Sequence, residues 1–241
     1  MDISVIIPVL NEQSGLSACL ARVLEQPDWH QCIVVDGGSS DDTLAIARQF
    51  PVEILQAQRG RGTQLNAGAA AASGAVLLFL HADVALPARA ARVIGRVLRD
   101  PDVVAGAFRT WTLPERVLTP SAPRVGVRRR VRIPLGPLLH LADIRSRYAK
   151  LPYGDQAMFV RAPVFFAAGG FPDEPLMEDL ALSRRLWSFG RVQVAPERVR
   201  VSGRRFQSAP LRQTLWVNSF PLLHAAGVST RFLARLYGAP R

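Results

Sequence analysis

The sequence predicts an α/β fold in which a mostly parallel central sheet is flanked by helices. Short runs that are apolar at every position, beginning with residues 3–9, alternate with stretches whose apolar residues recur at helical spacing. A continuous apolar run is typical of a parallel strand that is buried on both faces. Polar, glycine-rich clusters follow these runs, at the end of the strands where open α/β sheets bind ligands. The alternation therefore favours consecutive β-α-β units.

Apolar periodicity and the positions of glycine and proline assign the elements in order. After the strand at 3–9 we expect a helix at 14–25, a strand at 32–35, a helix at 41–50, a strand at 52–57, a helix at 64–72, a strand at 76–80, a helix at 87–99 and a strand at 103–109. Ser40 is a suitable N-cap for the helix at 41–50. Pro87 fits the first turn of the helix at 87–99.

The second half of the chain is less regular. Residues 112–150, rich in proline and arginine, form a basic excursion from a first domain that we place at 1–205. Within that domain we then expect a strand at 156–161, a helix at 163–168 ended by two glycines, a helix at 177–189 ended by Gly190, and a strand at 191–195. Residues 206–241 follow as an amphipathic helical C-terminal tail, broken near Pro221 and Gly227.

The net charge of +11 is almost entirely due to arginine, because Lys150 is the only lysine. Such a surplus favours polyanions such as nucleotide phosphates or anionic lipid, but an arginine-rich genome composition would produce it as well. Nucleic acid is not an expected partner, because the basic residues are not interleaved with aromatic ones and no known module pattern is present. Cys19 and Cys32 lack metal-ligand spacing and are expected to be buried thiols in a reducing compartment.

The chain shows neither a basic leader nor an apolar run of about 18 residues, which predicts a cytoplasmic protein. Between positions 120 and 150, eight basic residues accompany a single acid, Asp143. This excursion and the tail could together touch an anionic membrane on its inner face. The alternative is a solvated surface, with the tail packed on the core or on a second copy of the chain in a homodimer.

Two of the polar clusters suit a nucleotide. Asp36, followed by two glycines and a helix start, could accept hydrogen bonds from a base or ribose, although the segment also suits an ordinary turn. Arg59 and Arg61, separated by glycine, suit a diphosphate because arginine offers forked donors. Solvated arginines on a surface loop are the alternative.

Other carboxylates suit a metal ion and a general base. Asp83 lies at a strand end, where an oxygen ligand could hold Mg²⁺ or Mn²⁺ against phosphate oxygens. His81, two residues earlier, is either a ligand or a core histidine. Glu178 and Asp179 begin a predicted helix, where they either balance the helix dipole or supply a base for an acceptor hydroxyl.

Taken in order, these motifs resemble family 2 glycosyltransferases. The resemblance extends over about residues 2 to 200 and is carried by the segments 4–12, 34–43, 81–83 and 178–179. It implies a GT-A nucleotide-binding fold, a UDP- or GDP-sugar donor, a divalent metal ion (Mn²⁺ or Mg²⁺) and inversion at the anomeric carbon. The segments 59–68 and 154–156 look like those of a small bacterial subfamily.

The resemblance also implies roles for individual positions. The nucleoside pocket would be lined by Pro8, Asn11, Glu12 and Asp36. The metal would be held at Asp83, with Asp179 as the catalytic base and Glu178 supporting the acceptor site. Further donor contacts would come from Arg59, Arg61, Asn66 and His81.

The chain departs from the family pattern at several positions. Gly37 stands where the family frequently has a second acid, so the choice between a uridine and a guanosine nucleotide is left open. His81 replaces the first acid of an Asp-x-Asp motif. The Gln-x-x-Arg-Trp motif of processive polymer synthases is absent. We therefore expect a non-processive enzyme that moves a sugar to an unidentified hydroxyl or lipid-phosphate acceptor. A sugar-nucleotide nucleotidyltransferase and a non-catalytic nucleotide-sugar-binding protein are the alternatives.

Overall fold

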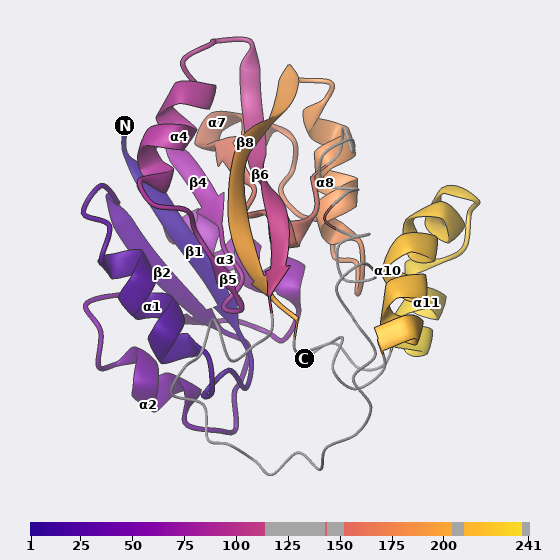
Figure 1. Ribbon diagram of the computed structural model, residues 1–241, viewed down its shortest axis with the longest axis horizontal. Helices are drawn as coiled ribbons and strands as arrows, with labels where there is room; N and C mark the ends of the chain where they lie inside the picture. Colours follow the sequence, from indigo (N-terminus) through magenta and orange to yellow (C-terminus); the bar gives the residue numbers. More distant parts are fainter. Residues whose placement is uncertain (114–142, 144–151, 204–209, 238–241) are drawn as a thin grey trace.

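The computed structural model describes residues 1–113, 143, 152–203 and 210–237. Its strands form one sheet in the order β3-β2-β1-β4-β7-β6-β8-β5 (Figure 1). The strands are β1 (Ile3–Val9), β2 (Gln31–Asp36), β3 (Glu53–Gln56), β4 (Val76–Phe79), β5 (Val84–Ala85), β6 (Val103–Leu113), β7 (Phe159–Arg161) and β8 (Arg191–Ser202). Only β7 and β5 run against the other strands of this sheet. The predicted α/β fold with a mostly parallel sheet is confirmed.

Both faces of the sheet are covered by helices. The helices that cover them are α1 (Leu16–Leu24), α2 (Thr43–Ala47), α3 (Arg61–Ala71), α4 (Ala90–Val97), α7 (Ala162–Ala167) and α8 (Glu178–Leu186), and the short 3₁₀ turn η1 (Gly154–Gln156) lies before β7. The C-terminal helices are α10 (Pro210–Ala225) and α11 (Thr230–Tyr237). The core on one face joins β1 to α1, α2 and α4, and the core on the other face joins it to α3, α7 and α8.

The continuous apolar run of β1 is explained by these two cores. Successive side chains of a strand point to opposite faces of the sheet. Val5 and Ile7 accordingly lie in the core with α1, whereas Ile6 lies in the core with α3, and all three are fully buried. Cys19 and Cys32 are buried free thiols, and burial raises the pKa of both to about 12.

Several predicted element boundaries are wrong. The N-cap position of α2 is Asp42 rather than Ser40, and the neighbouring Asp41 carboxylate accepts the backbone N–H of Thr43 at 3.0 Å. Pro87 lies outside α4, which begins only after Arg89 in a left-handed conformation (φ 57°). The segment between β4 and Pro87 includes β5, which was not predicted because its two-residue pairing depends on β8 and leaves no local sequence signal.

Strand β8 continues well beyond its predicted end at residue 195. Position 196 is a proline, and the ladder between β6 and β8 is irregular there. Phe108 pairs with Ala195, and the next residue of β6, Arg109, pairs with Arg198. Two residues of β8 are thereby accommodated as a bulge, and the strand reaches Ser202. Strand β6 extends correspondingly to Leu113, so the excursion begins after that residue.

The C-terminal helices lie beside α8, away from the sheet (Figure 1). The expected break at Pro221 is wrong, because Pro221 lies inside α10, whereas the chain does break at Gly227, which has a φ of 91°. Thr230, at the start of α11, donates a hydrogen bond to Glu174. Across 1–113, 143, 152–203 and 210–237, no helix is long and apolar enough to cross a membrane.

Most of the basic excursion lies outside the described residues. One of its members, Asp143, is buried, and its carboxylate accepts hydrogen bonds of 3.0 Å from both the backbone N–H and the hydroxyl of Thr112. The predicted boundary between the first domain and the tail, at residue 206, also lies outside the described residues and stays a prediction.

Candidate functional site

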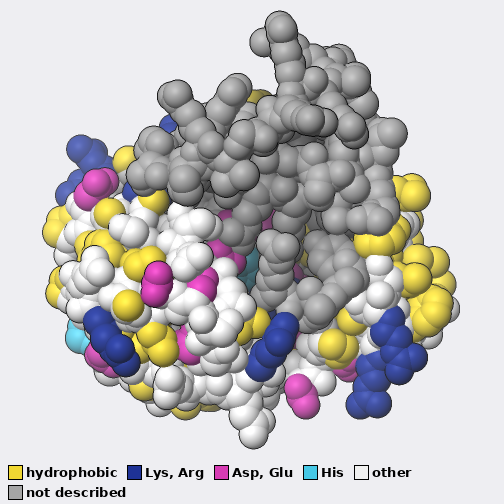
Figure 2. Space-filling model, turned by 90° about the horizontal axis from the view of Figure 1, so that it is seen from below, with side chains coloured by type: hydrophobic (Ala, Val, Ile, Leu, Met, Phe, Trp, Pro, Cys, Tyr) yellow, Lys and Arg dark blue, Asp and Glu magenta, His cyan; other side chains and the backbone are white. Residues whose placement is uncertain are grey.

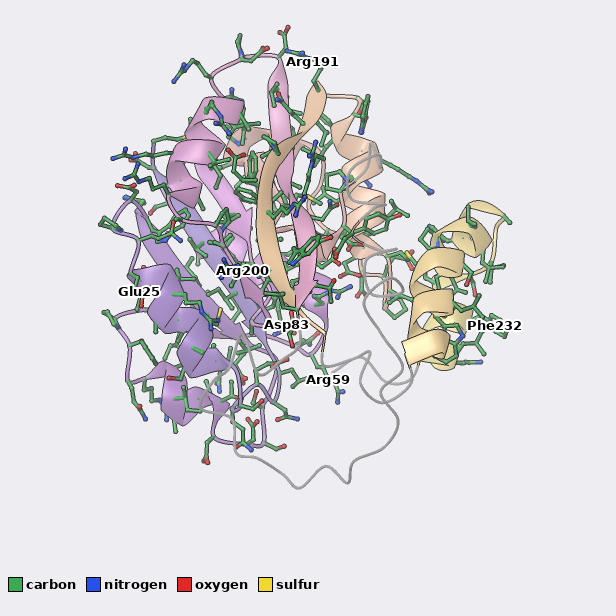
Figure 3. All side chains as sticks on the ribbon, viewed as in Figure 1. Glu25, Arg59, Asp83, Arg191, Arg200 and Phe232 are labelled. Carbon is green, nitrogen blue, oxygen red and sulfur yellow. The ribbon has the colours of Figure 1, made fainter. Side chains whose placement is uncertain are left out.

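The candidate site lies at the edge where the parallel strands β1 to β4 end. Polar residues that follow these strands meet there because the strands run in the same direction. Figure 3 shows Asp83 and Arg59 together at this lower end of the sheet. Figure 2, viewed from below, shows acidic and histidine side chains in the centre of the same face.

The Asp36 carboxylate organises the loop that follows β2. Asp36 is fully buried and accepts hydrogen bonds from the backbone N–H of Gly38 (3.0 Å) and Ser39 (3.1 Å) and from the Ser39 hydroxyl (2.5 Å). Its two oxygens are therefore already engaged by its own turn. The structure favours the turn alternative for this segment, and a direct contact of Asp36 with a nucleoside stays a prediction.

Asn11 and Glu12 join the end of β1 to the same region. Asn11 has a left-handed backbone (φ 54°), and its side-chain oxygen accepts the backbone N–H of Ser40 at 2.9 Å. The Glu12 backbone N–H donates to the Thr43 hydroxyl at 2.8 Å. Pro8 lies within β1: the ladder with β4 stops at Ile6, but the ladder with β2 continues past Pro8.

Arg61 lies in the first turn of α3 rather than in a loop before it, because Gly60 (φ 152°) turns the chain directly into the helix, and Arg59 precedes this turn. Arg61 forms an ion pair with Glu178, whose side chain is only 2% exposed. Gly62 lets α3 approach the loop before α8 closely at this point, because a Cβ added to Gly62 would lie 3.0 Å from the Pro172 carbonyl oxygen. Arg59 is exposed at the lower end of the sheet.

Asn66 holds the loop before α8 in place, and its expected contact with the donor stays a prediction. Its Nδ2 donates to the Phe171 carbonyl at 2.8 Å, and its Oδ1 accepts the Phe171 backbone N–H at 2.9 Å. Both polar groups of the amide are thus used to hold the loop before α8 against α3.

Asp179 and His81 meet on either side of Gly154. The Gly154 N–H donates to Asp179 Oδ2 at 2.5 Å, and the Leu180 N–H donates to Asp179 Oδ1 at 2.7 Å. A Cβ added to Gly154 would lie 2.9 Å from His81 Nε2 and 3.1 Å from Asp179 Oδ2. The histidine after β4 and the carboxylate of α8 therefore face one small space, although they are distant in sequence.

The two adjacent carboxylates have opposite pKa shifts. Burial raises the pKa of Glu178, but the charge and hydrogen bond of Arg61 outweigh burial and hold it below its usual range. Burial, followed by the negative charge of Glu178, raises the pKa of Asp179 above its usual range. Such a divergence is typical of carboxyl pairs whose members have different tasks.

Two site residues were missed by the sequence reasoning. Gly154 was noted only as part of a motif, although its N–H binds Asp179. Gln64, on α3, reaches the carbonyls that end β1 and β2. Neither could be found from local sequence, because both depend on how distant elements pack.

Asp83 fits a metal ion that is shared with a substrate. In the described part of the chain, no three His, Cys, Asp or Glu side chains are close enough together to hold an ion. Asp83 is half-buried at the end of β4, and its backbone carbonyl is fixed by the Ser202 N–H at 2.9 Å. Mg²⁺ is usually bound by one or two carboxylates together with substrate phosphates and water, so this ligand set suits an ion that arrives with a diphosphate.

The amino-acid sequence matches the profile of Glycosyl transferase family 2 over residues 4–162. The chain belongs to this family. Among relatives of this chain, Glycosyltransferase AglE from Haloferax volcanii is 42% identical over 91 residues, which are 34% of this chain and 30% of AglE. The match therefore spans about a third of each protein.

Solved structures share the fold of this family member. S. aureus TarS 1-349 in complex with UDP-GlcNAc has a TM-score of 0.62 at 18% identity, covering 85% of this chain and 59% of that one. The mannosyltransferase PcManGT from Pyrobaculum calidifontis, in complex with GDP-Man and Mn²⁺, has a TM-score of 0.62 at 18% identity, covering 92% and 64%. The expected GT-A fold is confirmed.

Proposed function

We propose that the protein transfers a sugar from a nucleotide diphosphate to an acceptor hydroxyl, with inversion at the anomeric carbon and with Asp179 as the general base. The buried pair of Glu178 and Asp179, with its opposite pKa shifts, carries this proposal. A carboxyl group of raised pKa takes a proton more readily, and it lies here at the ligand-binding edge of the sheet.

Glu178 and Gly154 keep Asp179 in place for that role. Glu178 remains an anion paired with Arg61, and its charge disfavours a second anion beside it. The Gly154 N–H holds Asp179 Oδ2. Asp179 would then take the proton from the acceptor hydroxyl while the oxygen attacks the anomeric carbon.

The donor end of the site is proposed to lie between Asp83 and Arg59. Binding of a UDP-sugar or GDP-sugar is supported by the ligands in the structures of similar fold. Asp83 would hold Mn²⁺ or Mg²⁺, and such an ion supplies positive charge that stabilises a departing diphosphate. Arg59, exposed at the same end, would add a charged donor to the phosphates.

The helical tail supports an acceptor at an anionic membrane surface. Among the residues with described side chains, large apolar groups are exposed on both C-terminal helices, including Leu222 (71%) and Phe232 (53%). Arg231 and Arg235 are exposed beside Phe232 on α11. Flotation with acidic liposomes at two salt concentrations tests this part. Salt-insensitive or absent binding would contradict it, and dimerisation measured by sedimentation would instead assign the apolar surface to a second copy.

The reaction itself is tested by incubating the protein with UDP- and GDP-sugars and Mn²⁺ and following nucleoside diphosphate release by mass spectrometry. Slow donor hydrolysis without acceptor, dependent on Mn²⁺ and on Asp83, is the expected result. Pyrophosphate release from a nucleoside triphosphate and a sugar phosphate would favour a nucleotidyltransferase. Binding without any hydrolysis would favour a non-catalytic nucleotide-sugar-binding protein.

A further inference from the structure

Gln64 holds its carboxamide between the carboxyl ends of β1 and β2. Its Nε2 donates hydrogen bonds to the backbone carbonyls of Val9 (2.9 Å) and Val35 (2.8 Å), and the residue is only 4% exposed. Carbonyl oxygens accept and never donate, so the two bonds identify the NH₂ group and thereby fix the opposite atom as Oε1. None of the described residues donates a hydrogen bond to this oxygen. Gln64 therefore presents an acceptor that its two NH₂ bonds hold in place at the ligand-binding edge of the sheet.

This acceptor occupies the space of a side chain at position 37. A Cβ added to Gly37 would lie 2.8 Å from Gln64 Oε1, so only glycine leaves room for the carboxamide. The preceding residue, Asp36, already accepts hydrogen bonds from its own turn, from Gly38 and Ser39. Gln64 of α3 thus places a second acceptor beside the end of β2.

We propose that Gln64 Oε1 selects the nucleobase of the donor by accepting a hydrogen bond from a ring N–H, so that the donor carries a base with such an N–H, as uracil and guanine have, and not cytosine or adenine. This inference rests on the proposed function, because it places the nucleoside at the ends of β1 and β2. Uracil and guanine have a ring N–H on the base-pairing edge, whereas cytosine and adenine have a lone pair at the corresponding nitrogen. A fixed acceptor would repel that lone pair and remain without a partner.

The wild-type protein is sufficient for the first test. Affinities for UDP, GDP, CDP and ADP are measured by calorimetry with Mn²⁺. We expect UDP or GDP to bind at least about tenfold more tightly than CDP and ADP, because a site built around an N–H rejects ligands that lack it. Methylation of the ring nitrogen, as in 3-methyl-UDP or 1-methyl-GDP, should lower the affinity for the preferred nucleotide by a similar factor. The matched controls, 5-methyl-UDP and inosine diphosphate, keep the ring N–H and should bind within about threefold.

A variant then assigns the effect to Gln64. Gln64→Met keeps the length of the side chain but removes the acceptor, and we expect the preference over CDP and ADP to fall below about threefold. The melting temperature of the variant is measured alongside. If the variant does not fold, binding of the methylated nucleotides to the wild-type protein tests the proposal instead. Equal binding of all four nucleotides by the wild type would overturn the base-reading role while leaving the proposed function intact. Binding of none of them with Mn²⁺ would contradict the proposed function itself.

Discussion

The backbone N–H of Gly154 binds the carboxylate of Asp179 at 2.5 Å, while the ring of His81 lies against the same glycine. Three segments that are far apart in sequence therefore converge at one backbone atom. The 3₁₀ turn containing Gly154 is held in turn by Gln156, which donates to the Phe108 carbonyl of β6 at 3.2 Å. The position of the proposed base is thus determined by the sheet as well as by its own helix.

Replacing Gly154 with alanine should disturb this convergence. The new methyl group would lie 2.9 Å from His81 and 3.1 Å from Asp179, so one of them must move, at a cost of about 1–3 kcal/mol. We expect lower turnover and a lower melting temperature. Gly95→Ala is the control, because no atom lies within 4 Å of its added Cβ, and it should leave turnover unchanged and slightly raise stability. Wild-type turnover in Gly154→Ala would show that the spacing of His81 and Asp179 is irrelevant.

Asp179→Asn should lower turnover by about 10²- to 10⁴-fold, since a general base contributes that much. Donor affinity should change little, because the proposed base acts on the acceptor. Steady-state kinetics and calorimetry with the nucleoside diphosphate separate the two effects. Asp173→Asn, an exposed carboxylate in the loop before α8, is the control and should behave as the wild type. A full loss of donor binding in Asp179→Asn would place the residue in the donor site instead.

The fold was predictable where the signal is local. The continuous apolar run at Ile3–Val9 reflects burial on both faces of the sheet, which any parallel strand between two helical layers requires. Strand β8 was predicted too short, because the proline at position 196 is accommodated in a bulge that depends on the pairing with β6. The start of α3 was misplaced because the helix begins directly at a glycine.

The candidate site was predictable as a set of residue types but not as a set of contacts. Asp179 and His81 were chosen from the sequence, and the structure places them on either side of Gly154. Asn66 was expected to meet a ligand, yet its amide pairs with the backbone of Phe171, a contact between residues more than a hundred positions apart. Long-range pairings of this kind leave no trace in local sequence, and the same holds for Gln64.

Asp83→Ala should remove the metal dependence of donor binding. The carboxylate is the proposed protein ligand of an ion that is otherwise bound by the diphosphate, so Mn²⁺ should no longer strengthen binding of the nucleotide. Calorimetry of the nucleoside diphosphate with Mn²⁺ and with a chelator measures this. Asp28→Ala, an exposed carboxylate before β2, serves as the control. If Mn²⁺ still strengthens binding in Asp83→Ala, the ion is held elsewhere.

Arg61→Met should destabilise the protein by leaving Glu178 buried without its ion-pair partner. We expect a loss of about 2 kcal/mol in the free energy of unfolding, less than for a fully buried pair because the Arg61 side chain is 32% exposed. The double variant Arg61→Met/Glu178→Gln removes both charges and should recover part of the loss. Urea unfolding measures all three proteins. A double variant no more stable than Arg61→Met would show that the cost is not due to the unpaired carboxylate.

The pH dependence of turnover should report the pKa of Asp179. As a base, Asp179 must be ionised, so turnover should rise with pH through a pKa that lies above the usual range of an aspartate. Burial is the main cause of the raised pKa, and the charge of Glu178 is the second. Glu178→Gln removes that charge, which makes ionisation of Asp179 easier, and the acidic limb of the profile should therefore move to lower pH.

The double variant Arg61→Met/Glu178→Gln distinguishes the source of this movement. Arg61 lowers the pKa of Asp179, so Glu178→Gln alone leaves an attractive charge beside the base. The double variant lacks both charges, and its acidic limb should lie at higher pH than that of Glu178→Gln. An acidic limb at the same pH in all three proteins would mean that turnover is controlled by a group other than Asp179, because no other carboxylate has Glu178 as its direct neighbour in the chain.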